Sequence, residues 1–159
     1  MRTNMLLSKN DVVEASNLML YTWKSDEYTY ERNEMFWMQG LINHIGQQQQ
    51  GNKNYLAIKA INEDGSMSAF LLASTFNESY NGDVVMNIND MIVDTYLPKS
   101  KNARDVMFLV DQVVEYCKVN NIKHWRADSI HESAEAYNYI NFLNKKYDGS
   151  ISYTFRGKL

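Results

Sequence analysis

The residues best suited to chemistry in this 159-residue chain flank Pro98, its only proline. Lys99 and Lys101 follow the proline, and Arg104 begins what reads as a long amphipathic helix. Basic side chains and the amides at a helix start both attract anions, so the segment favours a phosphate-bearing ligand. Residues 98–110 contain no glycine, however, and glycine usually lets a backbone approach a phosphate closely. The segment therefore predicts an anion site without the glycines that usually let the backbone surround a phosphate.

Two aspartates precede the proline on the strand expected over residues 84–97. Asp90 and Asp94 are four residues apart, so the alternation of a regular strand places both on one face. A carboxylate in such a place can accept a proton as a general base. Asp90 also has a structural reading as a solvated residue or as part of a bulge with Asn89, and both readings stay open.

The histidines and the cysteine give weaker indications of a functional site. His44, His124 and His131 show no metal-ligand spacing, so no metal site is expected. Cys117 is the single cysteine, lies at a core position of the long helix, and cannot form an internal disulfide. A chain without a disulfide fits a reducing, cytoplasmic compartment.

Composition limits the class of protein. With 45% hydrophobic residues, the chain is expected to fold as one domain over residues 1–159. The net charge of -3 makes extensive nucleic-acid contact unlikely. No apolar run approaches the length of a membrane span, and the N-terminus lacks a signal-peptide core.

The elements that position these residues follow from periodicity and turn residues. The pattern predicts an α/β (α+β) protein with four helices and a mixed, mostly antiparallel twisted sheet of about six strands. The expected strands cover residues 3–7, 55–61, 67–76, 84–97, 122–130 and 151–155. The expected helices begin near residue 11 and cover residues 31–45, 104–119 and 132–145. Residues 47–54, rich in glutamine, are expected to form a mobile surface loop.

This order, β-α-α-β-β-β-α-β-α-β with a strand-Pro-helix at its centre, resembles the GNAT superfamily of acyl-CoA-dependent N-acyltransferases. The family's central motif is Val-x-Pro, then [Gln/Arg]-x-x-Gly-x-[Gly/Ala], then a helix. Leu97 and Pro98 match its start, and Lys101 falls at the Gln/Arg position. Arg104 and Val106 stand where the family has its two small residues.

The resemblance implies transfer of an acetyl group from acetyl-CoA to an amine on a small molecule or protein. In that reading Asp90 is the base, and Tyr139 is the proton donor for the leaving thiolate. Tyr139 lies one turn before Phe142, which occupies the family's tyrosine position. The amides of Thr95 to Leu97 would bind the pantetheine arm. The implied cofactor-binding residues are Thr95, Tyr96, Leu97, Lys99, Lys101, Asn102, Ala103, Arg104, Asp105 and Val106.

The lost small residues support an alternative. The chain would then be a catalytically degenerate GNAT-fold protein with a structural or binding role, for example a bacteriophage virion component with assembly partners. Its location would be the host cytoplasm or the virion. A third idea, a base-modifying relative acting on viral DNA, is opposed by the acidic net charge. The alternating Ile151, Tyr153 and Phe155 would suit strand pairing across a homo-oligomer.

Overall fold

The structure, a computed structural model, describes residues 5–25, 33–127 and 134–151. The chain divides into two compact units, residues 1–128 and residues 129–159, and each is described by itself. No helix in the described ranges is long and apolar enough to cross a membrane.

The first unit is built on one four-stranded sheet with the strand order β1-β2-β3-β4. Its strands are β1 Tyr55–Ile61, β2 Met67–Asn77, β3 Val84–Val93 and β4 His124–Ala127. The first three strands pair antiparallel, whereas β4 runs parallel to β3. Gly65 and Gly82 adopt positive φ angles in the two hairpin turns, a conformation that glycine adopts without strain.

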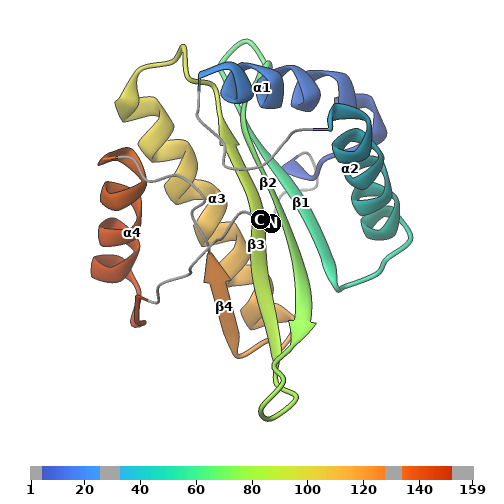
Figure 1. Cartoon of the computed structure of the whole chain (residues 1–159), viewed down its shortest axis with the longest axis vertical. Helices are drawn as coiled ribbons and strands as arrows, with labels where there is room; N and C mark the ends of the chain where they lie inside the picture. Colours follow the sequence, from blue (N-terminus) through green and yellow to red (C-terminus); the bar gives the residue numbers. More distant parts are fainter. Residues whose placement is uncertain (1–4, 26–32, 128–133, 152–159) are drawn as a thin grey trace, which may run out of the picture. The chain divides into compact units, whose positions relative to one another are not determined.

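Four helices and the short 3-10 helix η2 accompany the strands in the described ranges. They are η2 Lys9–Asp11, α1 Val12–Ser25, α2 Glu34–Gln49, α3 Lys99–Val119 and α4 Ala134–Lys146. The first four belong to the first unit, and α4 belongs to the second. In Figure 1, α1 and α2 cover one face of the sheet and α3 covers the other.

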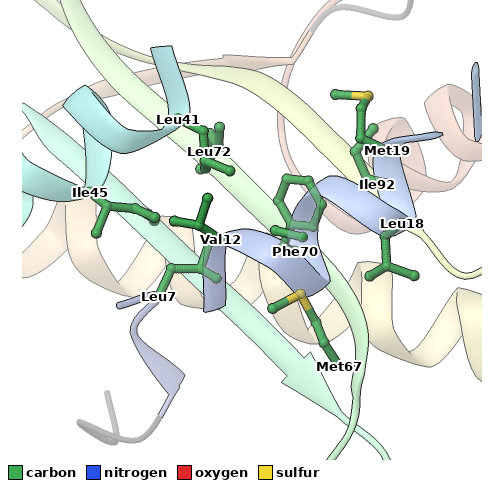
Figure 2. Close-up of a cluster of buried hydrophobic side chains, with 12 residues drawn as sticks. Leu7, Val12, Leu18, Met19, Leu41, Ile45, Met67, Phe70, Leu72 and Ile92 are labelled. Atoms are coloured by element: carbon green, nitrogen blue, oxygen red, sulfur yellow. The ribbon is translucent and has the colours of Figure 1, made fainter. Parts of the chain in front are cut away.

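The main core fills the space between the sheet and the pair α1 and α2, as Figure 2 shows. Trp37 packs on Phe70 at 6.1 Å between ring centroids and tightens the contact between α2 and the sheet. On the other face, α3 buries Leu109, Val113 and Cys117, as its periodicity predicts. The main core consists of Leu7, Val12, Ala15, Leu18, Met19, Leu41, Ile45, Ala57, Met67, Phe70, Leu72 and Ile92.

Strand β3 bulges at Asn89, where the sequence suggested a bulge or bend. Leu72 pairs with Asp90, but the next residue, Ala73, pairs with Ile88. Asn89 is therefore the extra residue on β3. The bulge places Asp90 opposite Leu72, so its side chain lies on the sheet face that carries the main core.

Strand β4 accompanies β3 for only part of its length. Val85–Ile88 pair with His124–Ala127, and β3 then continues to Val93. Figure 1 shows β4 beside one half of β3 only. Past Ile88, no described residue pairs with this side of β3.

The expected count of about six strands is not seen, since the described sheet has four. Residues 3 and 4 of the strand expected at residues 3–7 lie outside the described residues. Residues 5–7 show an isolated bridge between Leu6 and Ile58, and the Leu7 amide donates to the Ala57 carbonyl at 2.9 Å. The β3 strand ends at Val93 rather than at residue 97. Residues 152–159, which hold most of the expected last strand, lie outside the described residues.

The loop expected at residues 47–54 begins later than predicted, because α2 continues to Gln49. The reason is the side chain of Gln48. It accepts from the Ala57 amide at 2.6 Å and donates to the Ala57 and Leu7 carbonyls at 3.2 and 3.3 Å. The amide group thus pairs with β1 as a neighbouring strand would, and this contact holds the end of α2 in place.

Candidate functional site

Asp90 is placed by the bulge at the point where β3 leaves β4. Its carboxyl is largely withdrawn from water, and this burial raises the pKa of Asp90 to about 6. An aspartate with this pKa is ionised at neutral pH and is a stronger base than one in water. The position of Asp90 therefore suits the acceptance of a proton. The role of Asp90 as a general base stays a prediction.

Asp94 lies one residue past the end of β3 and shapes the turn that follows. Its amide donates to the Ser68 carbonyl at 2.9 Å, and its Oδ1 accepts from the Tyr96 amide at 2.9 Å. The Leu97 amide donates to the Asp94 carbonyl at 3.1 Å. Two of the three amides expected to bind pantetheine are thus engaged within this turn, and Thr95 is exposed beside them.

The expected basic loop after Pro98 is helical. The prediction that the helix starts at Arg104 is wrong, because α3 begins at Lys99. The amides of Lys101 and Asn102 both donate to the Pro98 carbonyl, at 2.9 and 3.1 Å. Without glycine, this segment has no reason to leave helical geometry, and proline is well suited to precede a first turn. These two amides therefore form hydrogen bonds of the first helical turn.

Lys101 turns inward from the first turn of α3. Its ammonium pairs with the Asp105 carboxylate four residues on, and it donates to the Ser68 hydroxyl at 3.2 Å. Ser68 is completely buried on β2, and Asp105 is 6% exposed. The side chain at the family's Gln/Arg position thus ties α3 to β2. Nothing in the sequence indicated Ser68, since it lies 33 residues away from Lys101.

The outer side of the same turn stays basic. Lys99 and Arg104 are exposed, and the first turn of α3 contains no acidic residue and no side-chain cap. A helix start of this kind favours an anion. The exposed Ala103 and partly buried Val106 complete the predicted segment. The Asn102 Oδ1 and Asp105 Oδ2 are buried without a hydrogen-bond partner among the described residues.

Tyr139 lies on α4, in the second unit, so the structure does not place it against Asp90. Burial, with a smaller effect from Tyr147, raises the pKa of Tyr139 well above its usual range. Its hydroxyl is buried and has no hydrogen-bond partner among the described residues. The phenol therefore holds its proton at neutral pH, which is the state a proton donor needs.

Other reactive groups have structural surroundings. His44 lies 2.9 Å from the Leu56 carbonyl and meets Tyr55 edge-on, and burial lowers its pKa. Cys117 is buried in the α3 core, where burial raises the pKa of its thiol to about 11. Within the described ranges, no three His, Cys, Asp or Glu residues gather as a metal site would require.

No family model matches this sequence, and no curated protein matches it either. Solved structures do match. An aminoglycoside 6'-N-acetyltransferase from Acinetobacter baumannii is 16% identical over 98% of this chain and 97% of its own, with a TM-score of 0.66. A ribosomal-protein-alanine N-acetyltransferase from Brucella melitensis is 15% identical over 96% and 97%, with a TM-score of 0.64.

A Trypanosoma brucei acetyltransferase is similar to the same extent, with 13% identity over 97% of this chain and 96% of its own and a TM-score of 0.65. Identities this low establish the fold and leave the substrate open. None of these comparisons supports the predicted bacteriophage origin or virion role. The chain is structurally similar to GNAT acetyltransferases over nearly its whole length.

Proposed function

We propose that this protein is an acyl-CoA-dependent N-acetyltransferase in which Asp90 is the general base. The observation that carries the proposal is the position of Asp90, a half-buried aspartate at a bulge just past the part of β3 that pairs with β4. With a pKa of about 6, Asp90 is ionised at neutral pH and can therefore accept a proton. The similarity to acetyltransferase structures supports the reaction class.

In the proposed reaction, acetyl-CoA supplies a thioester, the amine nitrogen forms a C–N bond to its carbonyl carbon, and the C–S bond breaks. Asp90 first takes a proton from the protonated amine, directly or through water, so that the nitrogen lone pair is available. The nitrogen releases its second proton to water as the amide forms, and the sulfur takes up a proton and leaves as the thiol of CoA. Tyr139 is our proposed source of that proton, and this assignment rests on the family resemblance and on its protonated state.

The residues present fit acetyl-CoA in part. The side of β3 after Ile88, with which no described residue pairs, suits the amide groups of a pantetheine arm, because strand edges bind such groups by backbone hydrogen bonds. Lys99 and Arg104, at the uncapped start of α3, suit phosphate groups. Lys101 does not fit this role while it is paired with Asp105.

Two measurements test the proposal. Calorimetric titration with acetyl-CoA should show binding, and a coupled thiol assay with a panel of primary amines should show release of free CoA. The Tyr139→Phe variant should keep acetyl-CoA binding and lower kcat, about 10- to 100-fold, because only the proton donor is removed. Absence of acetyl-CoA binding at saturating concentration would refute the enzyme reading.

A second function, binding without catalysis, is favoured by one observation. The amides of Lys101 and Asn102 are bonded to Pro98, so the glycine-type wrapping of phosphate is replaced by a helical turn. In that case acetyl-CoA would bind weakly or not at all, and the protein would purify with an assembly partner. Turnover by the purified chain alone excludes this alternative.

A further inference from the structure

Four polar side chains on the sheet face that carries Asp90 are joined by hydrogen bonds. Ser74 on β2 is in register with Asn87 on β3, and Asn87 is in register with Arg126 on β4. Arg126 Nε lies 3.0 Å from Asn87 Oδ1, and Asn87 Nδ2 lies 2.7 Å from Asn89 Oδ1. Asn89 Nδ2 lies 2.7 Å from Ser74 Oγ. We refer to Ser74, Asn87, Asn89 and Arg126 as the polar network.

The direction of the hydrogen bonds in the polar network is fixed by the groups that form them. Arg126 Nε can only donate, so the Asn87 atom that meets it must be the side-chain oxygen. The Asn87 nitrogen then faces Asn89 and requires an oxygen there, and the Asn89 nitrogen in turn faces Ser74. The Ser74 oxygen therefore accepts a hydrogen bond, and its own hydrogen remains to be donated.

Ser74 and Asn89 keep hydrogen-bonding capacity that the described residues do not use. No described residue accepts the Ser74 hydroxyl hydrogen or the second hydrogen of Asn89 Nδ2, and Asn89 Oδ1 has a second lone pair. Ser74 is half-buried and Asn89 is exposed, so a molecule from solvent can reach both groups. Because each hydrogen bond in a chain polarises the next, the Ser74 hydroxyl is a stronger donor than that of an isolated serine.

The polar network adjoins the proposed base. Asn89 directly precedes Asp90 at the bulge, and Asp90 lies opposite Leu72, two residues before Ser74 on the same face of β2. Ser74 and Asp90 are therefore diagonal neighbours on this face. A substrate whose amine lies at Asp90 thus has Ser74 and Asn89 beside it.

A hydroxyl group fits Ser74 and Asn89 better than a carboxylate does. A hydroxyl can accept from Ser74 and donate to Asn89 Oδ1 at the same time, whereas a carboxylate can only accept. Asp90 is ionised at neutral pH, so a second negative charge beside it would be repelled.

We propose that Ser74 and Asn89 bind a hydroxyl group of the acceptor substrate, which is accordingly a primary amine that carries a hydroxyl group. The Ser74 hydroxyl donates to the substrate hydroxyl, and the substrate hydroxyl donates to Asn89 Oδ1. Asn87 and Arg126 hold these two residues in place and do not contact the substrate. The inference rests on the proposed acetyltransferase function and names the substrate class of the same site.

Matched amines test the inference. The amino alcohols 3-aminopropan-1-ol, 4-aminobutan-1-ol and 5-aminopentan-1-ol are compared with propylamine, butylamine and pentylamine, which have no hydroxyl group. At least one amino alcohol should have a kcat/KM about 3- to 10-fold higher than its alkylamine, the effect of one or two neutral hydrogen bonds. β-Alanine, with a carboxylate in place of the hydroxyl group of 3-aminopropan-1-ol, should be the poorer acceptor of these two. Equal values in every pair, or a preference for β-alanine, would overturn the inference.

Variants identify the groups responsible, and they also correct for the basicity of the amines, which is the same for every variant. Ser74→Ala should lower the preference by raising the KM for the amino alcohol, and Ser74→Thr, which keeps a hydroxyl, should retain most of it. Thr75→Val removes a hydroxyl from the opposite face of β2 and should keep the preference. An equal preference in the wild-type protein and in Ser74→Ala would contradict the inference.

Asn89→Asp tests the direction of the hydrogen bonds. A carboxylate at position 89 can only accept, so the Ser74 hydroxyl would donate to it and have no hydrogen left for the substrate. The preference should therefore fall as in Ser74→Ala, although the serine is still present. The added charge also acts on Asp90, but it affects both amines of a pair and cancels in their ratio. A preference that Asn89→Asp leaves intact would count against the proposed contacts.

Binding is measured beside turnover so that two failures stay distinct. Turnover of both amines in every pair without a preference keeps the acetyltransferase and removes the role of the polar network. If no amine is acetylated, an NMR titration of the Asn89 side-chain amide decides. A shift of this signal that saturates with 5-aminopentan-1-ol and is lost in Ser74→Ala supports the hydroxyl site. No shift in the wild-type protein refutes it.

Discussion

The start of α3 and the bulged end of β3 lie close together in the sequence, yet their charged side chains have different surroundings. At the start of α3, the Lys101 side chain is held within the fold, since it pairs with Asp105 and donates to Ser68. At the bulge, Asp90 has no such partner among the described residues, and burial raises its pKa to about 6. A paired charge stabilises the structure, whereas a charge buried without a partner is costly to keep, and such groups gather at functional sites.

The largest effect should come from removing the base. Asp90→Asn keeps the shape of the side chain but cannot accept a proton, so kcat should fall about 100- to 10,000-fold in the thiol assay. In the wild-type protein, kcat/KM should rise with pH up to about 6 and then level off, because Asp90 must be ionised. Unchanged turnover in Asp90→Asn would remove Asp90 from the mechanism and erase the contrast between the two regions.

Breaking the Lys101 pair should affect stability. Lys101→Met leaves the buried Asp105 carboxylate unpaired and should lower the free energy of unfolding by about 3 kcal/mol in urea denaturation. The double variant Lys101→Met/Asp105→Asn should recover much of the loss. Lys118→Met, which breaks an exposed pair with Glu115, is the matched control and should cost under about 1 kcal/mol.

The same variant distinguishes the two roles of Lys101. If the ion pair is structural, the Kd for acetyl-CoA should change little in Lys101→Met. A large rise in Kd with unchanged stability would instead make Lys101 a phosphate ligand, and the start of α3 would then resemble the family motif more closely than its contacts indicate.

Asp90 should also affect how the free energy of unfolding depends on pH. Its folded pKa of about 6 exceeds the ordinary value of 3.8, so the folded state holds a proton that the unfolded state releases between these values. Stability is therefore lost as pH rises from about 4 to 6. At about pH 8, Asp90→Asn should raise the free energy of unfolding by about 2 to 3 kcal/mol, with little gain near pH 4. Denaturation at both pH values checks this, and an equal gain at both would mean that burial of the charge is not the cause.

The smallest effect is expected on the outer side of α3. Arg104→Gln should raise the Kd for acetyl-CoA about two- to fivefold at low salt and less at high salt, because the charge is exposed. Calorimetry at both salt levels measures it. A loss that salt leaves unchanged would indicate a direct, enclosed contact and a tighter phosphate site than α3 presents by itself.

Much of the fold followed from local patterns. The 3.6-residue spacing of Leu109, Val113 and Cys117 accounts for the buried face of α3, and Gly65 and Gly82 suit the positive φ angles of the two hairpin turns. The bulge near Asn89 was anticipated because two polar residues interrupt an apolar strand. The predictions failed at boundaries, where α3 begins five residues before Arg104 and α2 extends past its expected end.

Those boundaries depend on partners that are distant in the sequence. Gln48 ends up beside Ala57 and Leu7, and this pairing holds the last turn of α2 as helix. Lys101 reaches Ser68 only because α3 packs across β2. A local pattern contains no information about either contact, so it predicted a mobile loop in the first case and a phosphate-binding side chain in the second.

The sequence by itself determined the kind and order of the elements, the candidate base and the loss of the motif glycines, because these depend on residue type and spacing. Only the tertiary structure decided what each charge faces. Strand register brought Tyr55, Ser74, Asn87 and Arg126 into one row beside Asp90, and helix packing turned Lys101 inward. Burial and pairing set the chemistry of a charged group, and both arise from residues that meet only when the chain has folded.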